Sequence, residues 1–420
     1  MKREVISVPD VPPPLLGAQA VKVGHLVFVG GQLAFDGAAG VPHEARQDPR
    51  FPFFTSRTKL QTAFIMRNTR RILEGAGTTP DQGVRIDQYF TGRQEADPYF
   101  EVRKLTFDEA IRPASTAIPV DGFPVTGTTV QVGLVATIPG DGARKEPIMT
   151  DRAPIPLRGP QGARAGDWVF LTGVVASDFK SGVAPEARTN PDLWYGSNLK
   201  LQTQFCLRQL DAILRAAGSA LRRTVKAQVY LTAMADFCRF EEVWREFFPT
   251  DPPARTVIPV RELGFLGCMV EINLIALTDA SRLRREPVEA ADVPRSPLHE
   301  ARAMRAGEML FLSGLYATDF VAGRAPELVA DPAAAAGGAL QADYILGRAD
   351  TVCRAAGTSL DHAVWYQTFM NDLREFPTLA EVWRRRLGAP GPAALVVGVP
   401  GPQLIPECTL VMDLTAVIPG

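Results

Sequence analysis

The sequence predicts an α+β fold that occurs three times along the chain, each copy being a mixed sheet covered by two helices. The prediction depends on a repeated hydrophobic string and on the order of elements within one copy. The string is a short apolar run bounded by glycines, and it occurs at residues 24–31, 166–173 and 307–314. Its leading glycine recurs after 142 residues and then after 141 residues. Because each interval has the length of a small domain, we expect three tandem domains in the 420 residues.

Two further markers follow in the same order in every copy. A string of small residues ending in glycine lies near the middle of each copy, at 75–77, 216–218 and 355–357. An apolar string closes each copy, at 134–140, 274–278 and 414–420. Proline- and charge-rich stretches separate the copies and predict domains at residues 1–148, 149–289 and 290–420.

The element order is clearest in the middle copy. Apolar residues at helical spacing predict two helices, and Gly218 suits the left-handed position that ends the first of them. Because residues 225–231 alternate, we expect them to form a half-buried strand. The expected order is a strand at 168–175, a helix at 199–214, a strand at 225–231, a helix at 237–247, and strands at 256–260 and 268–277.

Composition and charge exclude several classes of function. Hydrophobic residues make up 46% of the chain and the net charge is −1, so no global field attracts nucleic acid or an anionic membrane. The five cysteines form no CxxC pair, and none of the four histidines has a ligand-spaced partner. The sequence has no nucleotide fingerprint, HExxH motif or Ser-His-Asp arrangement. We therefore expect a cytoplasmic protein with no metal, no cofactor and no nucleic-acid or membrane partner.

The middle copy also carries the strings Gly166–Gly173, Val225–Thr232, Phe247–Pro249, Pro253–Val257 and Val270–Ala276. With these strings, each copy resembles the Rid (YjgF-type) family of reactive-intermediate imine deaminases over nearly its whole length. The resemblance implies chorismate-mutase-like domains that form trimers with sites between subunits. Three fused copies would make a single-chain pseudo-trimer, which we expect to be a monomer or a weak dimer.

The resemblance also implies an activity, the hydrolysis of 2-imino acids or their enamine tautomers to 2-oxo acids and ammonia. In the family an arginine clamps the substrate carboxylate, which suits the planar fork of a guanidinium, and a glutamate holds the attacking water. These residues correspond to Arg255 and Glu271. We expect Arg255 to face a solvated cleft, so that its removal barely affects folding. A surface ion pair, for example with Glu262, is the alternative role.

The other two copies lack both groups. The arginine position reads Ala114 in the first copy and Ala394 in the third, and the glutamate position reads Gln131 and Val411. A family tyrosine near the N-terminal loop has no match in any copy, and Gly159 lies about there in the second. The resemblance therefore predicts one orthodox site, in the second copy.

Several other residues are candidates for substrate binding. The pairs Thr172–Gly173 and Ser313–Gly314 either line pockets, because glycine lets a ligand approach the backbone, or form turns at strand ends. Trp194 and Tyr195, like Phe51, Phe53 and Phe54, lie in an inserted loop that serves either as a pocket wall or as packing on its own domain.

The leading hypothesis is an imine or enamine hydrolase, or a related cyclase or lyase, acting on a carboxylate-bearing small molecule in a specialised pathway such as secondary metabolism. The alternatives are a non-catalytic protein that binds a small carboxylate and a structural protein of the same fold.

Overall fold

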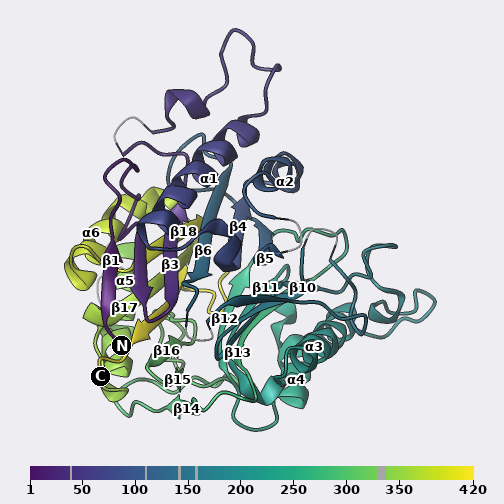
Figure 1. Cartoon of the computed structure of the whole chain (residues 1–420). Coiled ribbons are helices and arrows are strands. Elements are labelled where there is room, and N and C mark those ends of the chain that lie inside the picture. The colour runs from purple at the N-terminus through teal and green to yellow at the C-terminus, as the bar shows by residue number, and fades with distance from the viewer. Residues whose placement is uncertain (38–39, 109–110, 141–142, 157–158, 329–336) are drawn as a thin grey trace.

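The computed structural model describes the whole chain except residues 38–39, 109–110, 141–142, 157–158 and 329–336. It contains three sheets, each with two long helices, and so confirms the mixed α+β architecture (Figure 1). The sheet and helices that come first in the chain are called the first unit, and the second and third units follow.

The first unit has the strand order β1-β2-β3-β6-β4-β5. Its strands β4 and β5 run parallel, since helix α2 connects them, and the other pairs are antiparallel. The bounds are β1 Arg3–Ile6, β2 Ala20–Val23, β3 Leu26–Gln32, α1 Arg57–Gly75, β4 Gly83–Phe90, α2 Ala96–Arg103, β5 Ala114–Pro119 and β6 Val130–Thr137.

The second unit repeats this order as β7-β8-β9-β13-β11-β12, with a short strand β10 beside β13. All the elements expected from the sequence are present. The hairpin of β7 and β8 was not predicted, because its strands are short. The bounds are β7 Lys145–Ile148, β8 Gly162–Ala165, β9 Trp168–Leu171, β10 Val174–Val175, α3 Asn198–Ala216, β11 Thr224–Leu231, α4 Phe237–Phe247, β12 Ala254–Pro259 and β13 Val270–Leu277.

The third unit has the order β14-β15-β16-β19-β17-β18. Strands β7 and β14 pair with the second and third sheets, so these sheets begin a few residues before the predicted boundaries at 148 and 289. The bounds are β14 Arg285–Val288, β15 Ala303–Ala306, β16 Met309–Leu312, α5 Gly338–Ala355, β17 Ala363–Met370, α6 Phe376–Leu387, β18 Ala393–Gly398 and β19 Leu410–Val417.

Local signals explain the ends of helix α3. The hydroxyl of Ser197 accepts a hydrogen bond from the backbone N–H of Lys200, which caps the N-terminus of the helix. Gly218 follows the C-terminus with φ +69°, the left-handed conformation that glycine adopts without strain. Both ends are therefore encoded locally, as the sequence predicted for Gly218.

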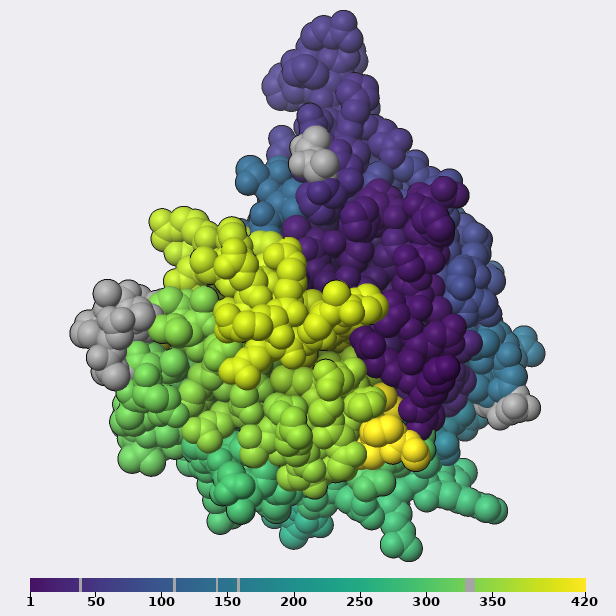
Figure 2. Space-filling model, turned by 90° about the vertical axis from the view of Figure 1, so that its left-hand side faces the viewer, coloured from purple at the N-terminus to yellow at the C-terminus, as the bar shows by residue number. Residues whose placement is uncertain are grey.

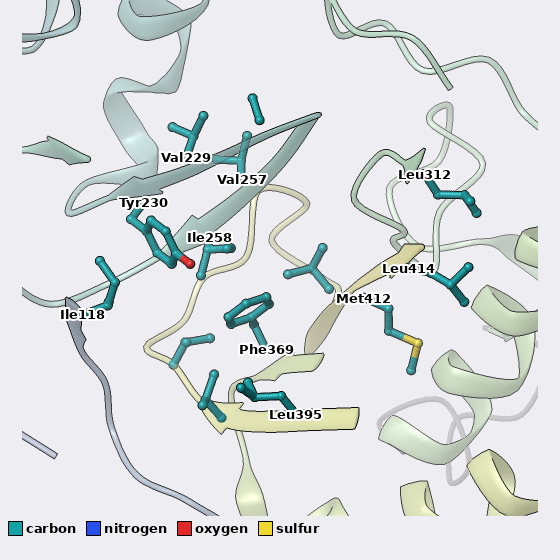
Figure 3. Close-up of a cluster of buried hydrophobic side chains, with 14 of the residues drawn as sticks. Ile118, Val229, Tyr230, Val257, Ile258, Leu312, Phe369, Leu395, Met412 and Leu414 are labelled. Carbon is teal, nitrogen blue, oxygen red and sulfur yellow. The ribbon is translucent and has the colours of Figure 1, made fainter. Parts of the chain in front are cut away.

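Strand β11 is buried along its whole length, so the expectation of a half-buried strand is wrong. One face packs under the helices of its own unit, and the other meets the neighbouring units. For example, Lys226 forms an ion pair with Asp413 of the third unit at 3.0 Å. The core also crosses the unit boundaries: Figure 3 shows Ile118 of the first unit beside Tyr230 of the second and Phe369 of the third.

The three units contact one another in a closed cycle. Arg261 of the second unit pairs with Asp121 of the first at 2.7 Å, and the Arg255 backbone N–H donates to Ser313 of the third at 2.8 Å. The third unit returns to the first through a backbone hydrogen bond from Ala18 to the carbonyl of Pro392 at 3.0 Å. Figure 2 shows the N-terminal residues against the third unit, and Figure 1 places the two chain ends close together.

Candidate active site

The three contacts between units are related in their backbone hydrogen bonds, and we call the region around each contact a cleft. In the first cleft, between the first and second units, the Gly173 N–H donates to the carbonyl of Ser115 at 3.0 Å. In the second cleft, between the second and third units, the Gly314 N–H donates to the carbonyl of Arg255 at 2.9 Å. The third cleft lies between the third and first units, where Gly31 approaches Leu395.

The strand register shows which residue of the first unit occupies the place of Arg255. The hydroxyl of Thr172 accepts from the backbone of Ser115, just as Ser313 accepts from the backbone of Arg255. Ser115 therefore stands at the arginine position, and the assignment of Ala114 from the sequence is wrong by one residue. An ungapped comparison of residues 113–116 with residues 253–256 would have found this. The assignment of Gln131 and Val411 is correct, because each pairs within its own sheet with the residue equivalent to the partner of Glu271.

Arg255 and Glu271 do not meet in one cleft. Arg255 on β12 pairs with Ala227 of β11, which in turn pairs with Leu274 of β13. Residues paired across a sheet share a face, and Glu271 is three residues from Leu274, so its side chain points to the opposite face. The structure brings Glu271 together with Thr172 and Gly173 in the first cleft, and Arg255 together with Ser313 and Gly314 in the second.

The first cleft contains a cavity of about 280 Å³ with residues of both units in its wall. Glu271, Thr172 and Gly173 line it, together with Gly159. The backbone of Gly173 lies so close to the Glu271 carboxylate that any larger side chain would collide with it. Arg93, Ser115 and Gly264 also line the cavity, and the rest of the wall is apolar: Phe90, Ala96, Phe100, Ala117, Pro119, Pro156, Pro160, Val175, Phe179 and Phe265.

Glu271 is buried in this wall, with 5% of its surface exposed. Burial raises the pKa of its carboxyl to about 8, although a hydrogen bond with the backbone of Ala117 acts in the opposite direction. The group therefore carries a proton over most of the neutral range and loses it near pH 8. A carboxyl with this property can donate a proton and then accept one.

The polar end of the first cleft was not predicted from the sequence. The Ser115 hydroxyl lies 2.7 Å from Gln88 Nε2 and 3.2 Å from Nη1 of Arg103, a fully buried residue at the end of α2. Arg103 follows Tyr89 by the same interval at which Trp244 follows Tyr230 in the second unit. On the helix, the first unit thus has the guanidinium of Arg103 where the second unit has an indole. On the strand, the first unit has the hydroxyl of Ser115 where the second unit has a guanidinium.

The second cleft is occupied by an ion cluster of the protein itself. The Arg255 side chain is 0% exposed; its Nη1 donates to Glu241 at 2.7 Å and its Nε lies 3.5 Å from Glu300. Its guanidinium also lies 4.9 Å from the ring centroid of Trp244. The expectation of an arginine facing a solvated cleft is therefore wrong. So is its suggested partner: Glu262 pairs instead with Arg93, at 2.7 Å.

Glu300 of the third unit stands where the second unit has Gly159, and its side chain is buried beside Arg255. The backbone bonds from Thr172 to Gln161 and from Ser313 to Arg302 are equivalent, and they align Glu300 with Gly159. Burial raises the pKa of Glu300 to about 7, although the Arg255 guanidinium opposes this shift. Burial also raises the pKa of Glu241, but its bonds with Arg255 bring it below its ordinary value. A carboxylate of the chain thus lies where a ligand carboxylate would meet Arg255.

The third cleft is filled by a tryptophan. The indole of Trp383 lies against Gly17 and Gly391, which have no side chains to keep it out, and close to the ring of Tyr366 at 5.6 Å between centroids. Ala394 offers no charged group. Of the three clefts, the first thus combines an open cavity with a buried acidic group.

The inserted aromatic loops do not form a wall of the first cleft. Trp194 is 96% exposed, and Tyr195 and Phe53 are also exposed, on loops that project from the body of the protein before α3 and α1 (Figure 1). Four of the five cysteines are buried, and Cys238 is exposed. Within the described ranges, no cluster of His, Cys, Asp and Glu could hold a metal ion, and no helix is long and apolar enough to cross a membrane.

Comparisons with known proteins agree with this geometry. The profile of the family described as Endoribonuclease L-PSP matches residues 160–278. A RutC family protein of Pyrococcus horikoshii is 36% identical over 134 residues, covering 31% of this chain and 97% of that protein. The chain belongs to the RutC or Rid family. The predicted resemblance is thus confirmed.

Another relative has a name that states an activity. The chloroplastic Reactive Intermediate Deaminase A of Arabidopsis thaliana is 31% identical over 142 residues, covering 33% of this chain and 70% of that protein. A chorismatase crystal structure aligns with 80% of this chain and 93% of its own, with a TM-score of 0.50 and 14% identity. At that identity the likeness concerns the fold alone, and it extends over more than one unit.

Proposed function

We propose that the protein is an imine or enamine hydrolase and that its working site is the first cleft. The observation that carries this proposal is the buried carboxyl of Glu271, which lines an open cavity between two units of a Rid family protein. A substrate of this class has an electrophilic carbon once its nitrogen is protonated, so a positioned proton donor and a water molecule suffice. The carboxylate clamp by Arg255 is not part of this proposal, because that side chain is enclosed by Glu241 and Glu300.

The proposed reaction uses Glu271 as an acid and then as a base. Its carboxyl protonates the imine nitrogen, or the enamine carbon of the tautomer, and becomes a carboxylate. Water attacks C2 of the iminium, the C=N electron pair moves to nitrogen, and Glu271 takes the proton that water loses. Glu271 then protonates the amino group of the carbinolamine, the C–N bond breaks with its electrons on nitrogen, and the hydroxyl proton returns to Glu271. The products are a 2-oxo compound and ammonia.

We also propose that the three units form a pseudo-trimer within one chain, with boundaries near residues 148 and 289. The cyclic contacts support this, as does a buried polar network to which every unit contributes. In it, Arg85 of the first unit donates to Gln228 of the second, and Gln228 donates to Gln367 and Asp413 of the third at 2.5 and 2.8 Å. Arg85, Lys226 and Trp365 occupy equivalent strand positions, so the three units differ from one another within this network.

The test is Glu271→Gln, which keeps the size of the side chain and removes its acidity. The assay is hydrolysis of 2-imino acids generated in place by an amino-acid oxidase. We expect kcat/KM to fall by about 10²–10⁴, the range for loss of a general acid or base. Gln131→Ala is the matched control, because Gln131 occupies the same strand position in the third cleft. Equal rates for the parent and Glu271→Gln would refute the proposal.

A further inference from the structure

The further inference concerns what the first cleft binds, and it depends on the proposed function for the identity of the reacting group. Ser115 stands where the second unit has Arg255, and it lines the cavity directly. The cleft therefore presents a neutral hydroxyl at the place where a guanidinium fork would be, and the surroundings of this hydroxyl decide what it can bind.

A serine hydroxyl has one proton to donate and two lone pairs to accept with. The Ser115 oxygen accepts from Gln88 Nε2 at 2.7 Å and from Arg103 Nη1 at 3.2 Å. The Gln88 amide is itself held, because its oxygen accepts from Arg103 Nη1 at 2.7 Å and its nitrogen also donates to the Thr116 carbonyl at 3.1 Å. With both lone pairs engaged by N–H donors, the hydroxyl is left to act as a donor, and the cavity is the side on which it is open.

Arg93, which pairs with Glu262 at 2.7 Å, also lines the cavity, and most of the remaining wall is apolar and suits a ring. Phe90 and Phe100 of the first unit face Phe179 and Phe265 of the second across about 280 Å³. Phe100 is held in place because the guanidinium of Arg103 stacks 4.6 Å from the centre of its ring. Transfer of an aromatic side chain from water into such a wall is favourable, whereas a methyl group would leave most of the cavity empty.

We propose that Ser115 is the substrate-binding donor of the first cleft, that Gln88 and Arg103 position it, and that the substrate is a 2-imino or enamine acid with a bulky aromatic side chain. Ser115 donates to a carboxylate oxygen of the substrate. Arg103 acts through Ser115 and holds its positive charge behind the hydroxyl. The side chain of the substrate packs among the four phenylalanines.

The first test is binding of non-reacting 2-oxo acids, measured by calorimetry with the full chain. We expect phenylpyruvate to bind the parent at least about tenfold more tightly than pyruvate, from burial of the ring. Ser115→Ala should weaken phenylpyruvate binding by about tenfold to a hundredfold, the range for a hydrogen bond to a charged group. Ser115→Thr keeps the hydroxyl and should stay within about threefold of the parent. The control is Thr378→Ala, an exposed hydroxyl on α6 of the third unit.

The second test separates positioning from folding. Gln88→Met removes one donor to the Ser115 hydroxyl without removing a charge. It should raise KM for the phenylalanine-derived imine severalfold and leave kcat nearly unchanged, because Glu271 is intact. Melting temperatures identify any variant that is merely unstable. If such a variant is found, the affinities of Ser115→Thr and Ser115→Ala for phenylpyruvate remain the deciding comparison.

The outcomes distinguish this inference from the proposed function. If phenylpyruvate binding depends on Ser115 but no imine is hydrolysed, the inference stands and the proposed activity is wrong. If imines are hydrolysed and Ser115→Ala binds phenylpyruvate as the parent does, the inference is overturned and the activity stands. Equal affinity of the parent for pyruvate and phenylpyruvate overturns the aromatic substrate class.

Discussion

The replacement Arg255→Ala is the sharpest test of how the second cleft is built. The sequence alone suggested that this change would leave folding almost intact. In the structure the guanidinium is fully buried, 2.7 Å from Glu241 and 3.5 Å from Glu300. Its removal takes the nearest cation from two buried carboxyl groups, of which Glu241 keeps only the half-exposed Arg245 at 3.4 Å. Breaking a buried ion pair by removing one partner costs about 3–5 kcal/mol, so we expect a strong loss of stability.

The pH dependence of this loss has a definite sign. Arg255 lowers the pKa of Glu300 against the effect of burial, so the pKa of Glu300 must rise further when Arg255 is absent. A carboxyl whose pKa is higher in the folded state than in the unfolded state contributes stability that is lost as the pH rises through the folded-state pKa. The difference in stability between the parent and Arg255→Ala should therefore widen from pH 6 to pH 9.

The measurement is the midpoint of urea unfolding, followed by tryptophan fluorescence, together with the melting temperature. We expect Arg255→Ala to melt roughly 3–6 °C below the parent. Arg261→Ala is the matched control, because Arg261 also joins two units but is 69% exposed, and such a surface pair contributes at most about 1 kcal/mol. If Arg255→Ala has the same urea midpoint and melting temperature as the parent or as Arg261→Ala, the ion cluster does not hold the second cleft closed.

Two further predictions follow from the first cleft and from the cycle of units. The kcat/KM of the parent should fall above a pH of about 8, where Glu271 loses its proton. The pH profile of Glu271→Gln should lack this fall. A parent profile that rises through pH 8 would mean that Glu271 acts first as a base. The protein should scatter light as a single chain of 45.5 kDa or as a weak dimer, and a stable trimer or hexamer would contradict the closure of the cycle within one chain.

Several positions could be assigned from the sequence because they lie in strings that repeat with the units. The alternation of strands and helices follows from local patterns, so the order in the second unit was predictable to within a few residues at each boundary. The equivalence of Glu271 with Gln131 and Val411 followed from the closing string. The shift from Ala114 to Ser115 was an error of alignment by one residue, and in a strand one residue also reverses the face.

The roles of Arg103 and Glu300 could not be found in the same way. Neither residue belongs to a repeated string, and a buried arginine on a helix has the same sequence signature as an exposed one. Glu300 is an ordinary charged residue in a proline-containing linker until the backbone bonds of the Ser313 segment place it beside Arg255.

The sequence by itself determined the family, the three α+β units, and the presence of both Arg255 and Glu271 in the second unit. Only the tertiary structure decided that these two side chains serve different clefts. The physical reason is that each cleft is built from two units, and the side chains of one sheet alternate between its two faces. Arg255 turns toward the helices and the third unit, and Glu271 turns toward the first unit. Whether a cleft is open, plugged by Glu300 or filled by Trp383 thus depends on how the side chains of two units meet, which no pattern within a single repeat states.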